Sequence, residues 1–515
     1  MKTAKRFLLV FLALTMLASA LLVGCKKKEE DGDETDGVVE TEETYETDEW
    51  GQRVYSTGIP DELDYGGDEV SILVRTKPFG DPRRYEWYAQ SFQGDALNTA
   101  IYYRNEEIQE ELGIVLKFPE ADDDKMNETI TKSYAAGVGG IDIVSNYHYY
   151  GTSTTVMECY KNLMHEDFTY LHLDHPYWNQ NFINTAKSND RLFVLVGDMT
   201  LSCYMTTFTM MFNKTLLGDL CDGMTDEQLY TKVLNGEWTW DYMTELCLNT
   251  YSDIDEVSGK SEGDRFGYTS HAKSHAYDGF VAAFDMDLTY VDDNGNHKFM
   301  DHTMQRTLGE AADKLAKFYR TDDAFLVGYK SESYVQPVAN FKQGLSLFCT
   351  SGMGDVQHLT EMTDEYGLLP LPKYTTEQEN YYGGVQDSHN NIAVMYHGAQ
   401  DYEQMSAVLE LFAAKSYSSV RPTLFEKVVK GKYLKDASSV KVFDIILAGT
   451  RWDFTDIYPS AVKDVRNTIW RDAIYKAVHG GSGDGAGAMT EAIAGNKTTI
   501  VDALKTHDEW LYTHY

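Results

Sequence analysis

The residues of this sequence best suited to chemistry are aromatic side chains placed beside polar ones. Eight of them lie in segments with the composition of loops, often next to Asp, Asn, His or Gln. A sugar has apolar faces that stack on aromatic rings and hydroxyl groups that need directional polar partners. The set as a whole is therefore consistent with sugar recognition, whereas any single ring is as well explained by core packing. The eight residues are Tyr147, Tyr149, Tyr150, Tyr177, Trp178, Tyr381, Tyr382 and Trp452.

Histidines that could bind a metal are spaced without a recognised pattern. His165, His172 and His175 lie in a stretch that mixes Pro, Asp and aromatic residues, and His271 and His275 stand four residues apart. The sequence contains no His-Glu-x-x-His motif, no Walker loop and no dinucleotide-binding glycine motif after a strand. The mixed composition favours a loop over a metal site. We therefore assign no metal, no cofactor and no catalytic residue.

One cysteine separates an apolar segment from a charged one near the start of the chain. Two lysines and an arginine precede a nearly unbroken apolar run, which ends in Leu-Val-Gly before Cys25. This arrangement is typical of a secretory signal, and the last four residues resemble the lipobox of bacterial lipoproteins. An uncleaved anchor helix is the alternative. We expect residues 1–24 to be removed and Cys25 to carry lipid, which anchors the protein at the cell surface in the outer leaflet of the cytoplasmic membrane.

The segment after Cys25 is strongly acidic. Residues 26–50 contain twelve acidic residues against three lysines and few apolar side chains. Such a composition buries too little apolar surface to offset the entropy of ordering the chain. We therefore expect an unfolded stalk over residues 25–67.

Composition bounds the remainder. The chain has 515 residues, which suits two or three lobes. Its formal net charge of −36 disfavours nucleic acid as a partner, because phosphate backbones need clustered Lys and Arg. Five cysteines follow Cys25 with wide spacing and no Cys-x-x-Cys pair, so they are expected to be mostly buried thiols. Cys221 and Cys247 are the one pair considered for a disulfide.

Strands and helices alternate after the stalk. In one helix Leu97, Ile101, Ile108 and Leu112 recur with helical period, and Gly113 is placed to cap it. The alternation predicts a parallel sheet with crossover helices, whose ligands bind at the carboxyl ends of the strands. The predicted segments are a strand at 69–75, a helix at 97–112, a strand at 114–118, a helix at 125–136 and a strand within 139–151.

Further along, the patterns indicate a second α/β lobe. Asn294-Gly295 predicts a β-hairpin turn, and the stretch GLSLFCTSGMGDV predicts a strand of a second sheet. The last quarter is mostly helical and is broken by GGSGDGAGAM, which we interpret as a surface loop.

The sequence resembles a family of known receptors. The motifs that carry the resemblance are LNTAIYYRNEEIQEELGI, GGIDIVSNYHYY, HPYWNQNFINTAKSNDRLFVLVGDMTLS, FNKTLL, GEWTWD, FKQGLSLFCTSG, YGLLPLPKY and GKYLKDASS. Their order is similar to that of family 1 extracellular solute-binding proteins, of the Gram-positive clostridial type. These are sugar-capturing receptors of ABC importers. The resemblance implies a monomer with two hinge-linked lobes that holds a carbohydrate between them and passes it to the transmembrane subunits of an ABC permease.

The resemblance also implies lobe boundaries and site residues. Lobe 1 is expected at residues 68–200 and 385–430, and lobe 2 at residues 201–384 and 431–515. The Trp-Thr-Trp-Asp stretch at residues 238–241 corresponds to a structural position. Strand ends and resemblance together give these ligand-binding residues: Arg75, Tyr147, His148, Asp198, Met353, Asp387, His389 and Trp452.

Two alternatives stay open. Many Asp and Glu residues could contain the carboxylate pair of a surface-anchored glycoside hydrolase. The same receptor fold could instead bind a peptide or a polyamine, which acidic walls would favour.

Overall fold

A computed structural model describes most of the chain after the acidic segment. The expected signal, Cys25 and most of the expected stalk lie outside the described residues. From Thr47 onward the chain forms one compact unit. The described residues are 46–48, 50–77, 81, 86–89, 95–137, 140–272, 274–327, 336–397, 401–426 and 437–513.

The first sheet takes four strands from the first third of the chain and one from much later. Its order is β13-β4-β1-β2, with β3 paired to the end of β1. β1 is parallel to β2, β3 and β4, as the alternating pattern predicts, whereas β13 runs antiparallel to β4. The strands are β1 (Asp68–Arg75), β2 (Ile114–Lys117), β3 (Glu120–Ala121), β4 (Ile143–Tyr147) and β13 (Asn390–Val394).

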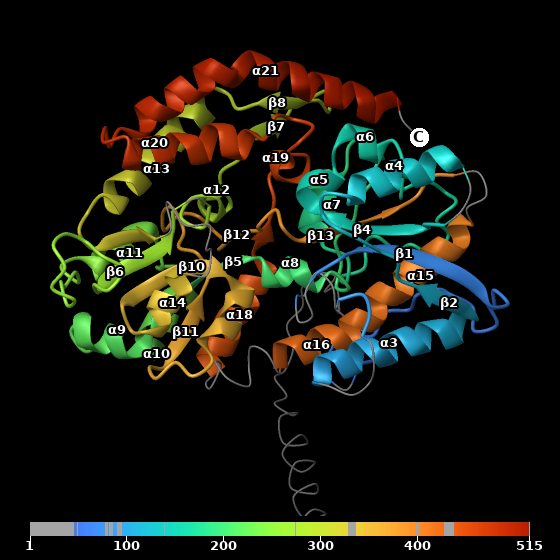
Figure 1. Cartoon of the computed structure of the whole chain (residues 1–515), viewed down its shortest axis with the longest axis horizontal. Coiled ribbons are helices and arrows are strands. Elements are labelled where there is room, and N and C mark those ends of the chain that lie inside the picture. Colours follow the sequence, from blue (N-terminus) through green and yellow to red (C-terminus); the bar gives the residue numbers. More distant parts are fainter. Residues whose placement is uncertain are drawn as a thin grey trace, which may run out of the picture. The chain divides into compact units, whose positions relative to one another are not determined.

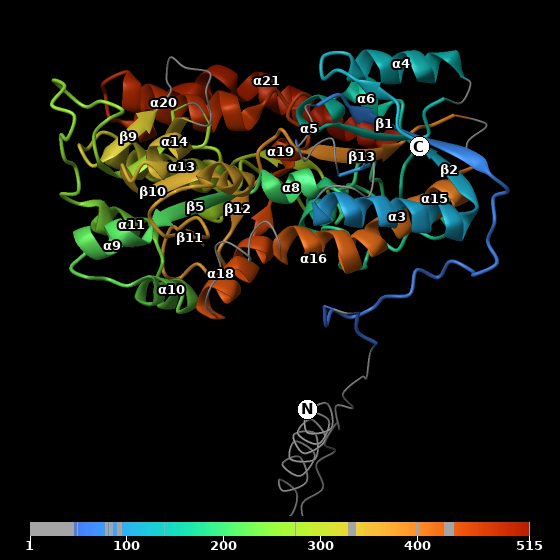
Figure 2. The ribbon, with the colours of Figure 1, turned by 60° about the horizontal axis from the view of Figure 1, so that its bottom comes forward.

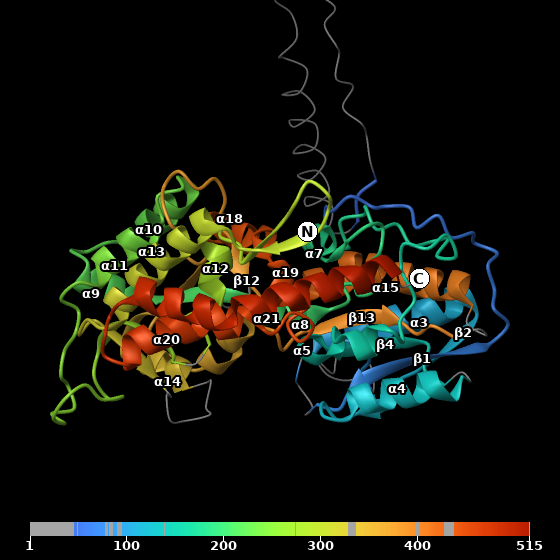
Figure 3. The same ribbon diagram turned by 90° about the horizontal axis from the view of Figure 1, so that it is seen from above.

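Helices cover both faces of this sheet. Asp95 caps the start of α3 through the backbone N–H of Asn98, and Gly113 ends it in the left-handed conformation at φ 61°. α3 packs with α15 on one face, while α4 lies on the other (Figures 1 and 3). The helices of this part are α3 (Ala96–Leu112), α4 (Met126–Ala136), α5 (His148–Gly151), α6 (Thr154–Met157), α7 (Gln180–Ala186), α15 (Tyr402–Lys415), the π-turn η2 (Ser416–Val420) and α16 (Arg421–Leu424).

The second sheet has the order β11-β5-β10-β6-β9. β10 is parallel to β6, and β6 to β9, whereas β5 runs antiparallel to both β10 and β11. Every residue of β5, β6, β10 and β11 is buried, which fits a sheet covered on both faces. The strands are β5 (Phe208–Asn213), β6 (Phe266–His271), β9 (Ala324–Val327), β10 (Ser346–Gly352) and β11 (Tyr366–Leu369).

Helices from the middle and the end of the chain cover the second sheet. α13 packs with α20 and α21 on one side, and α9 and α10 lie on the other (Figures 1 and 2). The helices are α9 (Lys214–Leu220), α10 (Asp226–Leu234), α11 (Trp240–Cys247), α12 (Gly279–Ala283), α13 (His302–Tyr319), α14 (Gln336–Lys342), the 3₁₀ turn η1 (Met353–Leu359), α18 (Ala437–Ala448), the π-turn η4 (Arg466–Arg471), α20 (Asp472–His479) and α21 (Gly485–Thr513).

The chain passes between the two sheets more than once. One passage includes α8 (Leu201–Met205), and another runs from β12 (Gly383–Gly384) to β13. These two passages pair with each other through an antiparallel bridge between Thr207 and Val385. A third contains β14 (Thr450–Arg451), which pairs with β12, and α19 (Phe454–Ile457). The fold is therefore a two-lobe α/β fold whose lobes share several crossing segments.

The C-terminal helix contacts both lobes. Its first half packs against α13, and the ring of Trp510 near its end lies 5.0 Å from the ring of Phe193 (Figure 3). Phe193 precedes Leu195, which bridges to Ile392 of the first sheet. The hairpin of β7 (Thr289–Val291) and β8 (His297–Phe299) packs beside this helix, and its turn contains Gly295 at φ 81° as predicted.

The glycine-rich stretch at residues 480–489 is a surface loop only in its first half, residues 480–484, which connect α20 to α21. Residues from Gly485 onward form the first turns of α21. A side chain at Gly485 would lie 2.4 Å from the carbonyl carbon of Ala312 in α13. Glycine is present here because two helices approach closely, and not because a loop is needed.

The expected stalk is also shorter than predicted. The ring of Tyr55 lies 5.4 Å from that of His175, and Ile59, Leu63 and Tyr65 pack against the core. These four side chains bury apolar surface, so the part of the segment near residues 55–65 belongs to the body.

The disulfide considered between Cys221 and Cys247 does not form. All five described cysteines are free thiols, namely Cys159, Cys203, Cys221, Cys247 and Cys349. Within the part of the chain that the model describes, no helix has the length and apolar character needed to cross a membrane.

Candidate functional site

A cavity of about 570 Å³ lies where strand ends of the two sheets meet. On the first sheet, β4 ends at Tyr147, opposite Asn390 at the start of β13. On the second sheet, β10 ends at Gly352, opposite Phe208 at the start of β5. Because ligands of open α/β sheets bind at the carboxyl ends of strands, this space is the candidate site. We call it the cleft cavity.

One wall of the cleft cavity is aromatic. Tyr147, Tyr149 and Tyr150 come from the end of β4 and from α5. The ring of Tyr150 lies 5.2 Å from that of Tyr147 and 4.9 Å from that of Tyr149, both edge-on. Burial, and then the nearby Asp387 carboxylate, raise the pKa of Tyr147 to about 12, so its hydroxyl is protonated and can donate. This wall offers both ring surface and hydroxyl groups.

The facing wall is polar and comes mainly from the second lobe. Ser274, His275 and Asp278 follow β6, and Asp355 follows β10. Burial lowers the pKa of His275, so this imidazole is neutral at pH 7 and can act as donor and acceptor. The Asp355 carboxylate accepts the backbone N–H of Gly352 at 3.2 Å, which fixes its orientation.

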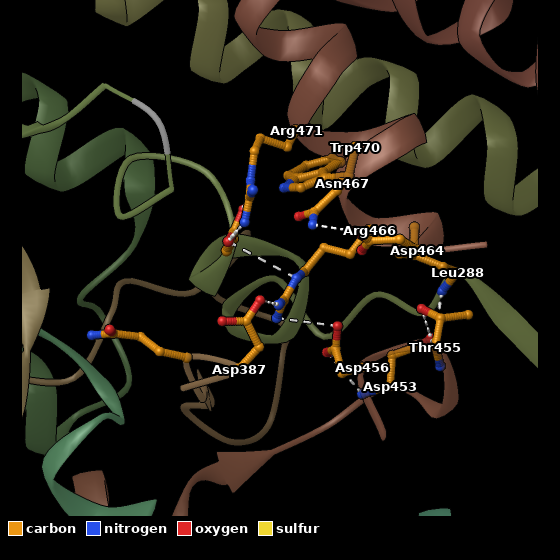
Figure 4. A network of polar contacts seen from close by, with 12 residues as sticks. Leu288, Asp387, Asp453, Thr455, Asp456, Asp464, Arg466, Asn467, Trp470 and Arg471 are labelled. Atoms are coloured by element: carbon orange, nitrogen blue, oxygen red, sulfur yellow. Dashed lines mark hydrogen bonds and ion pairs between the residues drawn. The ribbon is translucent and has the colours of Figure 1, made fainter. Parts of the chain in front are cut away.

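An ion-pair network supports the cavity from behind. Arg466 of η4 lies between Asp456, at 3.2 Å, and Asp387, at 3.5 Å (Figure 4). Asp278 binds Arg471 through Nε at 2.8 Å. Burial acts against the charge of Arg466, but its carboxylate neighbours outweigh burial and raise its pKa. The network joins residues from three parts of the chain and holds Asp387 in place.

The ion pairs between these carboxylates and arginines affect the charge that the cleft cavity presents to a ligand. Asp278 and Asp387 line the cleft cavity, but arginine side chains compensate both. Burial also raises the pKa of Asp387, which disfavours its charged form further. The cavity therefore presents many hydrogen-bonding groups and two carboxylates paired with arginines, while the third lining carboxylate, Asp355, has the His358 imidazole at 4.0 Å as a basic partner.

Three of the eight predicted site residues lie at or against the cleft cavity. Tyr147 and Asp387 line it. The buried Arg75 guanidinium lies 4.3 Å from the centre of the Tyr147 ring. Arg75 also donates to the backbone carbonyl of Ser388 and to Asn390, each at 2.9 Å. It positions the cavity wall without lining it.

Three others form a buried ring cluster that does not line the cleft cavity. The rings of His148 and His389 stack with centres 4.3 Å apart, and Trp452 lies 5.9 Å from His389. Residues 386–389 form a turn, within which the Nδ1 atom of the His389 ring lies 2.7 Å from the backbone carbonyl oxygen of Gln386. Burial lowers the pKa of His148 to about 4. His148 directly follows β4, Trp452 directly follows β14 and His389 directly precedes β13, and at these positions the rings pack together instead of lining the cleft cavity.

Asp198 and Met353 lie elsewhere. Asp198 pairs with Arg421 at 3.0 Å and lines a separate cavity of about 620 Å³, together with Trp178. Met353 is fully buried beside Met205, because the η1 turn that follows β10 directs Asp355 to the cleft cavity instead.

The residues that sequence reasoning missed lie mainly on the second lobe. Met353 is the one predicted site residue that directly follows a strand of the second sheet. The carboxyl ends of β6 and β10 also indicate Ser274–Asp278 and Asp355, which the prediction left out. Asn467 and Arg471 carried no such signal, because η4 reaches the cavity only through the packing of the C-terminal helices.

Groups of possible metal ligands occur among the described residues, but outside the cleft cavity. Two sets bring three ligand atoms within 4.8 Å of one another. One contains His172, His175 and the buried Glu410. The other is an acidic loop in which two of three carboxylates are exposed. The latter set is Asp253, Asp255 and Asp264.

Comparisons with known proteins show which solved structures share this fold. No protein-family model matches the chain, and a search of curated proteins found no match in sequence. Solved structures match well in shape. The sugar-binding protein MalE from Xanthomonas citri has a TM-score of 0.57 and 14% identity, and the match covers 87% of this chain and 100% of that chain. The fold is that of two-lobe solute-binding proteins.

Two further structures agree. A cyclo/maltodextrin-binding protein complexed with maltotetraose matches with a TM-score of 0.51 and 12% identity, over 86% of this chain and 97% of that chain. A family 1 extracellular solute-binding protein from Bifidobacterium longum subsp. infantis matches with a TM-score of 0.50 and 14% identity, over 83% of this chain and 99% of that chain.

Proposed function

We propose that this chain is a carbohydrate-binding receptor of the family 1 extracellular solute-binding type. It captures an oligosaccharide in the cleft cavity and delivers it to an ABC permease, and lipid on Cys25 holds it at the cell surface. The observation that carries the proposal is the pairing of an aromatic wall on one lobe with a hydrogen-bonding wall on the other. Sugar rings need both kinds of surface.

Arginines compensate two of the three carboxylates that line the cleft cavity, Asp355 being the third, and this pairing favours a neutral sugar over a polyamine. A polyamine needs carboxylates that are free to pair with its ammonium groups. Asp278 and Asp387 are already paired with Arg471 and Arg466. One of the matched proteins is a cyclo/maltodextrin-binding protein complexed with maltotetraose and another is a sugar-binding protein, which adds support for a sugar here.

A binding screen tests the proposal. The full chain is mixed with neutral oligosaccharides, uronic acids, peptides and polyamines, and its melting temperature is recorded. A neutral oligosaccharide at 100 times its Kd should stabilise the protein by about 2.7 kcal/mol. Stabilisation by a polyamine or a peptide alone would refute sugar binding, and turnover of a chromogenic glycoside would support the hydrolase alternative instead.

A pair of tyrosine variants then locates the site. Tyr150 is 46% exposed on the aromatic wall, and Tyr103 is 53% exposed on α3, away from the cavity lining. Tyr150→Ala should weaken binding of the identified sugar roughly tenfold, which corresponds to about 1.4 kcal/mol of lost contact. Tyr103→Ala should leave Kd unchanged. Equal effects in calorimetry would place the sugar elsewhere.

A further inference from the structure

A second group of functional side chains, all of them possible metal ligands, lies in the first lobe and outside the lining of the cleft cavity. His172 and His175 belong to the loop before α7, and Glu410 lies in the middle of α15. The two imidazole rings stack with centres 5.0 Å apart and planes inclined by 16°. The Nδ1 atom of His172 lies 3.1 Å from Oε1 of Glu410, and that of His175 lies 3.3 Å from the same oxygen.

The other oxygen of Glu410 is held by separate donors. Oε2 accepts the backbone N–H of His172 and the indole N–H of Trp178, each at 3.1 Å. Glu410 is fully buried, so these bonds fix the carboxylate with Oε1 directed toward the two imidazoles and toward the Tyr177 hydroxyl, which donates to it. Metal-binding carboxylates are oriented by outer hydrogen bonds in this way.

The distance from each histidine Nδ1 atom to Oε1 of Glu410 fits a tetrahedral metal ion, and all three ligand atoms lie within 4.8 Å of one another. Zinc binds imidazole nitrogen and carboxylate oxygen at about 2.0–2.1 Å, which separates neighbouring ligand atoms by about 3.3–3.4 Å. The two measured distances to Oε1 are close to that separation. The Tyr177 hydroxyl donates to Oε1 of Glu410 and contacts the Nδ1 atom of His175, and it lies too close to both atoms to be a further ligand of the same ion.

An ion can reach this position from solvent. The side chains of His172 and His175 are 37% and 18% exposed, while Glu410 is buried beneath them. The ligand types select the ion, because imidazole favours zinc and its neighbours over magnesium or calcium. We propose that His172, His175 and Glu410 form a binding site for a divalent transition ion of the zinc type.

An ion bound at this site would connect three segments of the first lobe. The histidine loop, α15 and the N-terminal segment meet here, since the Tyr55 ring contacts His175. The ion stabilises this contact and does not participate in ligand capture, because none of its ligands lines the cleft cavity. The proposal is therefore independent of the proposed function.

Zinc titration of the full chain tests the site. The protein is prepared without a polyhistidine tag, stripped with a chelator and titrated with zinc chloride in a calorimeter. One equivalent should bind and raise the melting temperature, while magnesium chloride should do neither. The double variant His172→Ala/His175→Ala should lose this binding. The control is His165→Ala, which replaces a partly exposed histidine seven residues before His172 and should bind zinc as the wild type does.

Three results would overturn the proposal. They are absence of zinc binding by the wild type, equal binding by the double variant, and loss of binding in the His165 control. Circular dichroism of the metal-free double variant checks that it is folded. X-ray absorption of the zinc-loaded wild type gives a measurement without any variant: only nitrogen and oxygen ligands are expected, and sulfur ligands would assign the ion to a cysteine instead.

Discussion

Replacing Arg466 by methionine should destabilise the protein strongly, because this residue compensates buried carboxylates. Its side chain is 5% exposed, and its two close partners, Asp456 and Asp387, are 10% and 25% exposed. Removing one partner of a buried ion pair leaves uncompensated charge and costs about 3–5 kcal/mol. The matched control is Arg306→Met. Arg306 is 72% exposed and lies 4.0 Å from Glu310, so its loss should cost about 1 kcal/mol or less.

The pH dependence of this loss gives a second measurement. Burial raises the pKa of Asp387 and of Asp456 in the folded protein, and removing Arg466 removes the group that opposes this rise. A carboxyl group with a raised folded pKa keeps its proton where the unfolded chain has lost it. Stability therefore falls as pH rises from the unfolded value of about 4 through the folded value. The difference between wild type and Arg466→Met should be large at pH 7 and smaller at pH 5.

Urea unfolding at both pH values tests this reasoning. Adding Asp456→Asn to Arg466→Met should recover part of the stability, because it removes one uncompensated charge. Two results would refute the network as described. One is a loss below about 1 kcal/mol at pH 7, and the other is a larger loss at pH 5 than at pH 7.

Three further predictions concern other parts of the chain. Trp240→Ala should lower the free energy of unfolding by about 3–5 kcal/mol without changing sugar affinity, which urea unfolding and calorimetry together measure. Gly485→Ala should cost about 1–3 kcal/mol, because the added methyl meets the backbone of Ala312; an unchanged melting temperature would contradict the close helix contact. Cys25→Ser should move the protein out of the membrane fraction or leave its signal uncut, as fractionation and mass spectrometry would reveal.

Local patterns were sufficient for most elements of the first sheet. The helix predicted over residues 97–112 follows from apolar side chains at helical spacing and from Gly113 as its cap, and the structure begins it at Ala96 with Asp95 as the N-cap. The parallel arrangement follows from short strands alternating with helices. The structural role assigned to Trp240 is confirmed: its ring is buried, with the rings of Phe280 and Phe318 at 5.0 and 5.5 Å.

The site was predicted less well, because strand ends indicate a region and not the direction of each side chain. His148 directly follows Tyr147 in the chain, yet only Tyr147 lines the cleft cavity. The Nε2 atom of His148 instead lies 2.9 Å from the carbonyl of Asp456, a residue 308 positions away. No local pattern contains that contact.

The sequence by itself determined which segments form helices and strands, since caps, turns and apolar periods depend on neighbours within a few residues. Only the tertiary structure decided which side chains meet. Arg466 and Arg471 reach Asp387 and Asp278 across 79 and 193 residues, and Glu410 meets His172 across 238. The physical reason is that burial and pairing of charges depend on distances in space, which chain separation does not encode.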